Sequence, residues 1–306
     1  MKAIHGPIHP PPSSQIARNL IEYRPGMRVE FGAGAIHVIQ WLNPNDPPTG
    51  EVLKRELDDL IERTGLPIQV PPLRVAETKA EFLRHLSEIA EGAKTRWPIV
   101  HLETHGADWG IGTRKDHIEW ADLKGPLAEI NIACRLNLVV VNQACSGEWL
   151  RQVVRPPDPA PVRGFIGPTR TLESDEITRG NSAFYRSLFS SFDVGIACAA
   201  MNAAVPSGTA RPLFVAEKAE DLFRLVVQNY FETYCSTDRL DERVAALTAT
   251  AAKEGLPDRT ARLRSILGDH GQVFDWIKAT FFFIDRCPEN RERFPVTLED
   301  CFPKRT

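Results

Sequence analysis

Residues 138–147 read LVVVNQACSG, and this stretch decides both the fold and the chemistry that we predict for the chain. Four apolar residues, three of them β-branched, are typical of a strand that is buried on both faces of a parallel sheet. The small residues that follow predict a tight turn, which places Cys145 at a carboxyl end, the edge where open α/β sheets bind ligands. Cys145 is therefore a candidate nucleophile. A lone cysteine after an apolar run is more often a buried structural residue, so this stretch alone leaves both interpretations open.

A second strand ending lies upstream, where residues 98–106 read PIVHLETHG. This short apolar run ends in His105, followed by Gly106, and the gap from His105 to Cys145 is 40 residues. Two parallel strands that end in His-Gly and in Cys-x-Gly can place an imidazole beside a thiol, and the imidazole then takes the thiol proton. Glycine lets the backbone approach a substrate closely, so we expect the N–H groups of Gly106 and Cys145 to stabilise an oxyanion.

The group that orients His105 is not evident from the sequence. The two-residue period of a strand puts His101, Glu103 and His105 on one face, which makes Glu103 a candidate for that role. A backbone carbonyl would serve equally well. We interpret His101 and His117 as structural.

The segment 143–147, QACSG, resembles the caspase signature, which carries its histidine about fifty residues earlier. It departs from that signature at Ser146 and in the shorter gap to His105. The wider pattern is similar to that of the bacterial caspase-like peptidases, the group of CHAT and prokaryotic-caspase proteins. Three further segments fit this group, namely 118–123 (IEWADL), 164–167 (GFIG) and 182–185 (SAFY). The resemblance covers roughly residues 35 to 230.

The resemblance implies an α/β fold with three αβα layers around a mostly parallel, caspase-like sheet. It implies a cysteine endopeptidase with Cys145 and His105 as the catalytic pair and with no metal or organic cofactor. Relatives in this group commonly cut one dedicated protein in immune or cell-death responses. A protein substrate, an activating partner protein and a role in bacterial defence are the corresponding expectations. Two alternatives remain: an inactive relative that acts as a binding module or scaffold, and a non-peptidase hydrolase that uses the same pair.

The resemblance also suggests which bond is cut. In such relatives an acidic residue just before the next helix helps form the pocket for the residue that precedes the cut bond. Asp175 is the matching position, Glu173 lies beside it, and the Gln143 amide can add an acceptor to the same pocket. A carboxylate there binds Arg or Lys and repels Asp, so we predict cleavage after a basic residue. If Asp175 only caps the helix, the pocket is apolar and a leucine-like residue is preferred.

The composition is that of a soluble globular protein, with 42% hydrophobic and 25% charged residues. The formal net charge of -3 gives no electrostatic reason to expect nucleic acid or an acidic membrane as a partner. No apolar run approaches the length of a spanning helix and no signal-peptide core is evident, so we expect a cytoplasmic protein. The six cysteines contain no C-x-x-C pair, so neither a zinc site nor a disulfide framework is indicated.

Three regions are expected along the chain. Residues 1–34 are expected to be an irregular tail, because Gly, Pro and Ser dominate their start. Residues 35–215 are expected to form the peptidase core, and residues 216–306 a mainly helical extension packed on it.

Within the core, strands and helices are predicted to alternate, which indicates a parallel sheet with right-handed crossovers. The first elements are a strand at 36–42, a helix from the N-cap Thr49 to the C-cap Gly65, a strand at 68–70 and a helix after the N-cap Thr78. The proline-rich stretch 153–161 cannot be helix or central strand, so we predict an exposed connection there.

Overall fold

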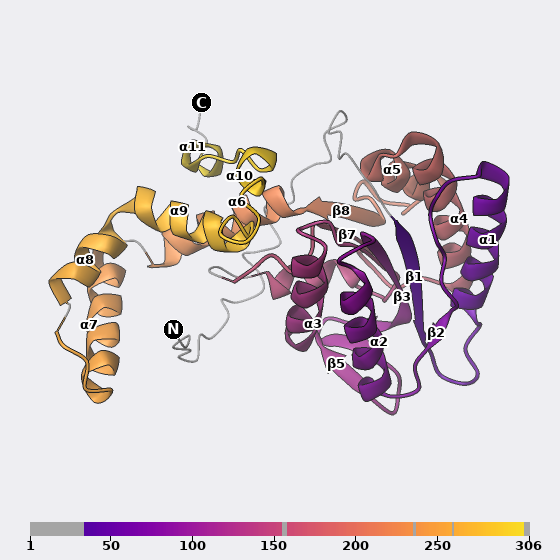
Figure 1. Ribbon diagram of the computed structural model, residues 1–306. Coiled ribbons are helices and arrows are strands. Elements are labelled where there is room, and N and C mark those ends of the chain that lie inside the picture. Colours follow the sequence, from indigo (N-terminus) through magenta and orange to yellow (C-terminus); the bar gives the residue numbers. More distant parts are fainter. Residues whose placement is uncertain (1–33, 155–157, 235–236, 259, 303–306) are drawn as a thin grey trace.

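The computed structural model of the protein describes residues 34–154, 158–234, 237–258 and 260–302 (Figure 1). Of the predicted tail at 1–34, it describes Gly34 alone. The strands are β1 (Ala35–Trp41), β2 (Arg74–Val75), β3 (Pro98–Ala107), β4 (Gly110–Gly112), β5 (His117–Glu119), β6 (Val139–Asn142), β7 (Gly164–Pro168) and β8 (Phe214–Lys218).

Strands and helices alternate up to β3, and after the β4–β5 hairpin each strand up to β7 is again followed by a helix. Those that cover the sheet are α1 (Thr49–Thr64), α2 (Lys79–Gly92), α3 (Trp120–Ala133), α4 (Ser174–Ser191) and α5 (Val194–Ala204), with a 3-10 helix at Gly147–Val153. The later helices are α6 (Ala219–Tyr234), α7 (Thr237–Lys253), α8 (Thr260–Gly268), α9 (His270–Phe281), α10 (Asn290–Arg293) and α11 (Leu298–Cys301). Among the described residues, no helix combines the length and apolar character needed to cross a membrane.

The sheet is mostly parallel, with the strand order β2-β1-β3-β6-β7-β8. The β8 strand runs antiparallel to β7, whereas the other neighbouring pairs on this path are parallel. The β4–β5 hairpin pairs antiparallel with the last residues of β3. Figure 1 shows α1, α4 and α5 on one face of the sheet and α2 and α3 on the other. The predicted three-layer αβα architecture is confirmed.

The central strands are apolar on both faces because each face is covered by helices. All four residues of β6 are buried. Val139 and Val141 belong to the cluster that packs against α1, α4 and α5, whereas Val140 belongs to the cluster under α2 and α3. Full burial of one such side chain contributes about 1.5–3 kcal/mol. This two-sided burial fixes the register of β6 and therefore the point at which the strand ends.

Two predicted details of the early elements are wrong. Helix α1 has its N-cap at Pro48, and Thr49 is its first residue, because the Thr49 hydroxyl donates to Glu103 in the sheet instead of capping the helix. The predicted strand at 68–70 forms only a single bridge, between Gln69 and Ala35, and the regular pairing with β1 occurs later, in β2.

The prediction of an exposed connection at 153–161 is wrong for the residues whose burial the structure describes. Val154, Ala160 and Pro161 are buried, and residues 158–159 are half-buried. The Ala160 N–H donates to the carbonyl of Phe281, and its carbonyl accepts from the side chain of Asn131 on α3. This end of the connection is covered by the helical extension, which the local sequence does not indicate. Residues 155–157 lie outside the described residues.

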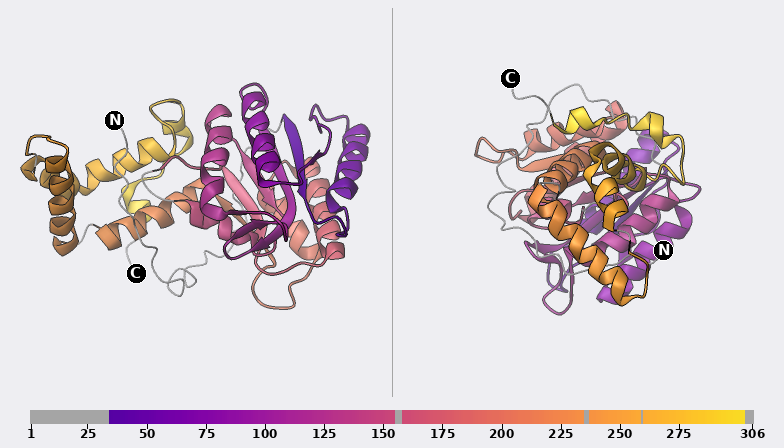
Figure 2. Two further views of the ribbon diagram at one scale, coloured as in Figure 1. Left: turned by 90° about the horizontal axis from the view of Figure 1, so that it is seen from below. Right: turned by 90° about the vertical axis from the view of Figure 1, so that its left-hand side faces the viewer.

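The chain after β8 forms the helical extension. Phe223 on α6 packs against Phe282, with ring centroids 4.8 Å apart, and Phe282 stacks on Phe294 at 4.7 Å. These rings belong to the same buried cluster as residues of α2 and α3, so the near part of the extension shares the core of the sheet. The far part does not: Figures 1 and 2 show α7 and α8 at the end most distant from the sheet, and α8 has no buried residue.

Candidate active site

The two predicted catalytic residues follow neighbouring parallel strands. In the β3–β6 pair, Ile99 lies opposite Val139 and Leu102 opposite Asn142, an offset of 40 residues. The Gln143 N–H continues this ladder by donating to the Leu102 carbonyl at 3.0 Å. The same offset separates His105 from Cys145, so the register carries both side chains to the same level of the sheet edge.

The pleat of β3 decides the face of the sheet on which His105 lies. Ile99 and Val141 point into the apolar cluster under α1 and α4, and successive side chains of a strand alternate between faces. His105, within β3, therefore lies on the α1/α4 side, and Cys145 lies in the turn that follows β6. The His105 side chain is 50% exposed, and Cys145 is half-buried. Both are accessible from the carboxyl edge of the sheet.

Gly106 allows the two strand ends to touch. A Cβ atom at Gly106 would lie 2.4 Å from the Cys145 carbonyl oxygen and 2.7 Å from the Ala144 Cβ. Real side chains do not tolerate such distances, so this position requires glycine for close approach. The predicted closeness of the His-Gly and Cys-x-Gly ends is therefore present in the backbone.

The turn that carries the thiol is held in an uncommon conformation. Ser146 has φ 56° and ψ 31°, in the left-handed region that non-glycine residues rarely occupy. The side chain of Asn142 stabilises this turn, because its Oδ1 accepts from the Ala144 N–H at 3.2 Å and its Nδ2 donates to the Gly147 carbonyl at 3.4 Å. Such conformations gather at functional sites, where the surrounding structure holds them in place.

An aspartate that the sequence did not single out holds the His105 ring. His105 Nε2 lies 2.6 Å from Oδ2 of Asp46, in the loop between β1 and α1. The Asn43 amide nitrogen also lies near Nε2, at 3.0 Å, and 2.8 Å from the same Asp46 oxygen. We assign the hydrogen to Nε2, because the contact with the carboxylate oxygen is the shorter one and two lone pairs there would repel each other. Nδ1 is then the unprotonated nitrogen of the neutral ring and can act as a base.

Asn43 fixes the same loop to the β4–β5 hairpin. Its Oδ1 accepts from the Arg114 N–H at 3.1 Å, which orients the amide, and its Nδ2 therefore donates to Asp46 Oδ2 at 2.8 Å. The Asn43 backbone N–H also donates to Asp46, at 2.6 Å. Partial burial raises the pKa of Asp46, but the hydrogen bonds from His105 and Asn43 outweigh it, so the pKa of this carboxyl lies below its usual value.

The candidate orienting group Glu103 serves other partners. Its carboxylate is 1% exposed and accepts from Thr49 at 2.6 Å, from Asn181 at 2.8 Å and from His101 at 2.8 Å. Asp46 takes the place beside His105 that we considered for Glu103. His101 is buried in this network and bonds to the Tyr185 hydroxyl at 2.8 Å, which agrees with its interpretation as structural.

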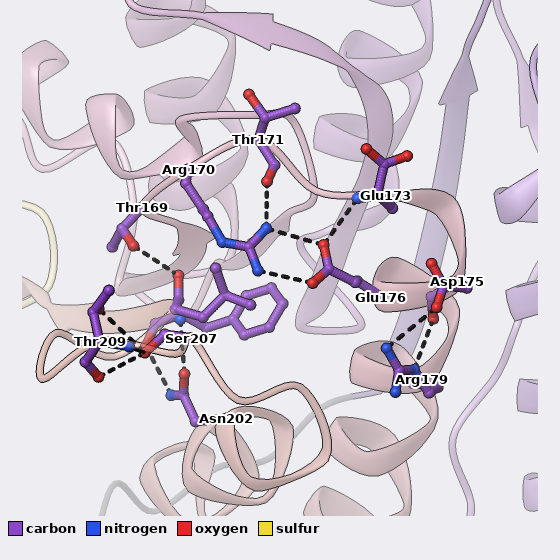
Figure 3. A network of polar contacts seen from close by, with 12 residues as sticks. Thr169, Arg170, Thr171, Glu173, Asp175, Glu176, Arg179, Asn202, Ser207 and Thr209 are labelled. Atoms are coloured by element: carbon purple, nitrogen blue, oxygen red, sulfur yellow. Dashed lines mark hydrogen bonds and ion pairs between the residues drawn. The ribbon is translucent and has the colours of Figure 1, made fainter.

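Both acidic residues in the first turn of α4, which follows β7, form ion pairs with arginines (Figure 3). Arg170 donates with two nitrogens to the Glu176 carboxylate, at 2.8 and 3.0 Å. Asp175 pairs with Arg179 at 3.2 Å, and its side chain is 73% exposed. Glu173 is the N-cap residue of α4, so Asp175 lies in the first turn and does not cap the helix. The predicted concentration of negative charge is therefore offset by Arg170 and Arg179.

Gln143 lies two residues before Cys145, directly after β6. It is 1% exposed, and neither its Nε2 nor its Oε1 has a hydrogen-bond partner among the described residues. An unpaired buried amide is uncommon, because leaving such a group unsatisfied costs about 1–3 kcal/mol. The side-chain amide of Gln143 is thus unpaired within the described residues, whereas Asp175 is paired with Arg179.

The sequence does contain one indication of Asp46, namely its place in the polar loop after the first strand. Residues 43–48 follow β1 at the carboxyl edge of the sheet, the same edge that carries His105. A polar side chain at that edge can reach a neighbouring site. Which of Asn43, Asn45 and Asp46 faces the imidazole depends on the path of the loop, and residue pattern does not determine that path. No group of three or more His, Cys, Asp and Glu side chains in the described part of the chain is arranged to hold a metal ion.

No family model and no curated protein matches the sequence. Among solved structures, the chain is similar to a secreted C11 cysteine protease from Bacteroides thetaiotaomicron, "iotapain", with a TM-score of 0.44 and 10% sequence identity. The match covers 67% of this chain and 72% of that chain. A likeness this distant carries no functional argument, so the proposal below rests on the geometry of the site.

We expect Gly106→Ala to separate the two strand ends. The new methyl group would meet the Cys145 carbonyl at 2.4 Å, and overpacking of this kind costs about 1–3 kcal/mol of stability. Because the thiol moves with its backbone, kcat/KM for any peptide substrate should fall by about 10²-fold. Gly92→Ala is the matched control, since a Cβ there meets nothing within 4 Å. Wild-type kcat/KM in Gly106→Ala would contradict the close contact of the strands.

We expect Asp46→Ala to lower kcat by about 10²-fold while KM changes little, because the imidazole loses its tautomer and its orientation. Asp46→Asn should lose most of the same activity. The lowered pKa of Asp46 means that the carboxylate contact is present above the usual carboxyl pKa. The contact is lost only as the pH falls through the lowered value. Steady-state kinetics of the three proteins at pH 7, where the lowered pKa keeps the Asp46 carboxylate ionised, check this. Equal kcat in all three proteins would contradict the role of Asp46.

Proposed function

We propose that the protein is a cysteine endopeptidase in which Cys145 is the nucleophile, His105 the general base and acid, and Asp46 the group that orients His105. One observation carries the proposal: the β3–β6 register and the Gly106 contact bring a half-buried thiol to the level of an imidazole whose Nε2 is held by a carboxylate. A thiol, a base and an orienting group in this order form the arrangement that activates a nucleophile.

The mechanism follows from the protonation state of the His105 ring. Nδ1 takes the proton of the Cys145 thiol, and the thiolate attacks the carbonyl carbon of the scissile peptide bond. Backbone N–H groups of Gly106 and Cys145 stabilise the resulting oxyanion. His105 then gives the proton to the leaving amine, and water hydrolyses the thioester after His105 removes a proton from it. Asp46 stabilises the transient imidazolium throughout.

We further propose that the residue before the cut bond is basic. Two features of the described structure support this: the unpaired Oε1 of buried Gln143 can accept from a guanidinium or ammonium group, and Glu173 and Asp175 lie at the start of α4, at the same edge of the sheet. The ion pair between Asp175 and Arg179 weakens this contribution, because the carboxylate is already partly neutralised. Gln143 is 1% exposed, so its amide contributes only where an entering substrate side chain displaces the residues that cover it.

The biological setting is a proposal from the motifs at 98–106 and 143–147, whose resemblance extends to CHAT and other bacterial caspase-like proteins. We place the protein in the cytoplasm of a bacterium, where it cuts one dedicated protein during immunity or regulated cell death once a partner protein activates it. The genes that lie beside its own are the first place to look for the substrate and the partner.

We expect Cys145→Ala to abolish peptide cleavage and to leave the melting temperature close to that of the parent, because the substitution removes the nucleophile and little packing. His105→Ala should lower kcat by several orders of magnitude, about 10³-fold or more. A panel of fluorogenic peptides and circular dichroism check both variants. Cleavage by Cys145→Ala at the parent rate would exclude the mechanism. A folded parent that cleaves no peptide and no co-expressed neighbour protein would favour the scaffold alternative.

We expect peptides that differ only in the residue before the cut to be cleaved faster after Arg or Lys than after Leu or Asp. Asp175→Ala should lower this preference by about two- to fivefold, and Arg179→Ala should raise it similarly, because exposed ion pairs contribute at most about 1 kcal/mol. The two variants remove opposite halves of one ion pair and therefore control for each other. Faster cleavage after Leu or Asp would contradict the basic preference.

A further inference from the structure

We propose that Glu103 and Thr49 are positioning residues that hold Asp46 in place against His105. The inference rests on the proposed function, because it concerns the geometry of the same catalytic pair. It assigns a role to a buried charged network that the mechanism above does not use.

The network joins β3, which carries His105, to the start of α1 and to α4. Glu103 belongs to β3, two residues before His105. Thr49 is the first residue of α1, three residues after Asp46. Asn181 comes from α4, the helix whose first turn carries Asp175. The Glu103 carboxylate accepts from both Thr49 and Asn181, so one side chain of the sheet fixes the position of both helices.

The hydrogen bonds of the network converge on the Glu103 carboxyl group, whereas Asn181 Oδ1 is buried with no hydrogen-bond partner among the described residues. Oε2 of Glu103 bonds to the Thr49 hydroxyl, and Oε1 bonds to Asn181 Nδ2 and His101 Nε2. His101 Nδ1 accepts from the Tyr185 hydroxyl. Burial, with a contribution from the Glu103 charge, raises the pKa of Tyr185 well above its usual value, which keeps this hydroxyl protonated as a donor.

A carboxylate in an apolar core is costly, so its retention here calls for a physical reason. Glu103 is 1% exposed among the Leu, Ile and Val side chains that pack between the sheet and α1 and α4. Desolvation of an ion costs several kcal/mol before its partners compensate, and an apolar pair would often be as stable. What an apolar pair cannot supply is direction: a charged hydrogen bond of 2.6 Å sets the position of the Thr49 backbone, whereas apolar contacts allow it to slide.

The position of Thr49 matters because it ends the loop that carries Asp46. The next residue, Gly50, donates its N–H to Oε1 of Gln40 on β1 at 3.0 Å, so two side chains of the sheet hold the start of α1. Between these bonds and the end of β1, the loop has few residues with which to present Asn43 and Asp46. A displacement of Thr49 is therefore passed directly to the carboxylate that faces His105.

The test compares Thr49→Val, which removes only the hydroxyl donor, with Thr49→Ser, which keeps it. Thr64→Val makes the same change at the other end of α1, where the hydroxyl bonds only to carbonyls of the helix, and is the matched control. Thr49→Val should lower kcat by about tenfold or more on the best peptide substrate, with little change in KM, because small displacements at a catalytic group have large effects. Thr49→Ser and Thr64→Val should stay close to the parent. Glu103→Gln should lower kcat as Thr49→Val does.

A double-mutant cycle separates positioning from general destabilisation. In an Asp46→Ala background, Thr49→Val should have no further effect on kcat, because the residue it positions is already absent. The inference would be overturned if the fold-losses in kcat of the two single variants multiplied in the double variant, or if Thr49→Val had the kinetics of the parent. Neither result would count against the proposed roles of Cys145 and His105. If the parent protein itself cleaved no peptide, that result would instead count against the proposed function.

Amide hydrogen exchange supplies a readout that does not require activity. Thr49→Val should speed exchange in the segment 42–48 relative to the parent, whereas Thr49→Ser and Thr64→Val should not. Unchanged exchange in Thr49→Val would overturn the inference whether or not the parent cleaves peptides.

Discussion

The parallel pairing of β3 with β6 is the constraint on which the site depends. Its register relates residues 40 positions apart, and the same offset separates the imidazole of His105 from the thiol of Cys145. Because β6 is buried on both faces, a slip of one residue would turn its valines to the wrong layers and the thiol to the wrong side. The apolar core therefore sets the geometry of the catalytic pair.

Polar side chains refine what the apolar core sets. Asn142 holds the turn after β6, Asp46 holds the His105 ring, and Glu103 holds the start of α1. The Asn142 bond holds the end of β6 to its own turn, and the other two hold β3 to the β1–α1 loop and to the start of α1. Apolar packing fixes which residues meet at this edge, and these bonds fix how their side chains are directed.

The parts of the site that depend on strand endings could be predicted from the sequence. The runs before His105 and Cys145 show where each strand stops, and neighbouring parallel strands end at one edge, so the pair follows from local pattern alone. Asp46 could not be chosen in this way, since its role depends on the path of an irregular loop. The prediction of Thr49 as an N-cap failed because it rested on local pattern. Such a pattern cannot show that the Thr49 hydroxyl bonds instead to Glu103, 54 residues later.

The start of α4 shows the limit of counting charges in a sequence. Glu173, Asp175 and Glu176 suggest a negative pocket in the sequence, but Arg170 and Arg179 face two of these carboxylates in the structure. The i,i+4 spacing of Asp175 and Arg179 was visible in the sequence and indicates such a pair.

The central claim is that His105 activates Cys145, and alkylation of the individual thiols tests it most directly. Burial raises the pKa values of Cys134 and Cys198 to about 12 and that of Cys301 to about 11, so these thiols should react slowly with iodoacetamide at neutral pH. Peptide mapping by mass spectrometry gives the rate at each of the six cysteines. The account predicts that Cys145 reacts far faster than the other thiols and that His105→Ala removes this advantage. A Cys145 rate equal to that of the buried thiols, or unchanged in His105→Ala, would contradict it.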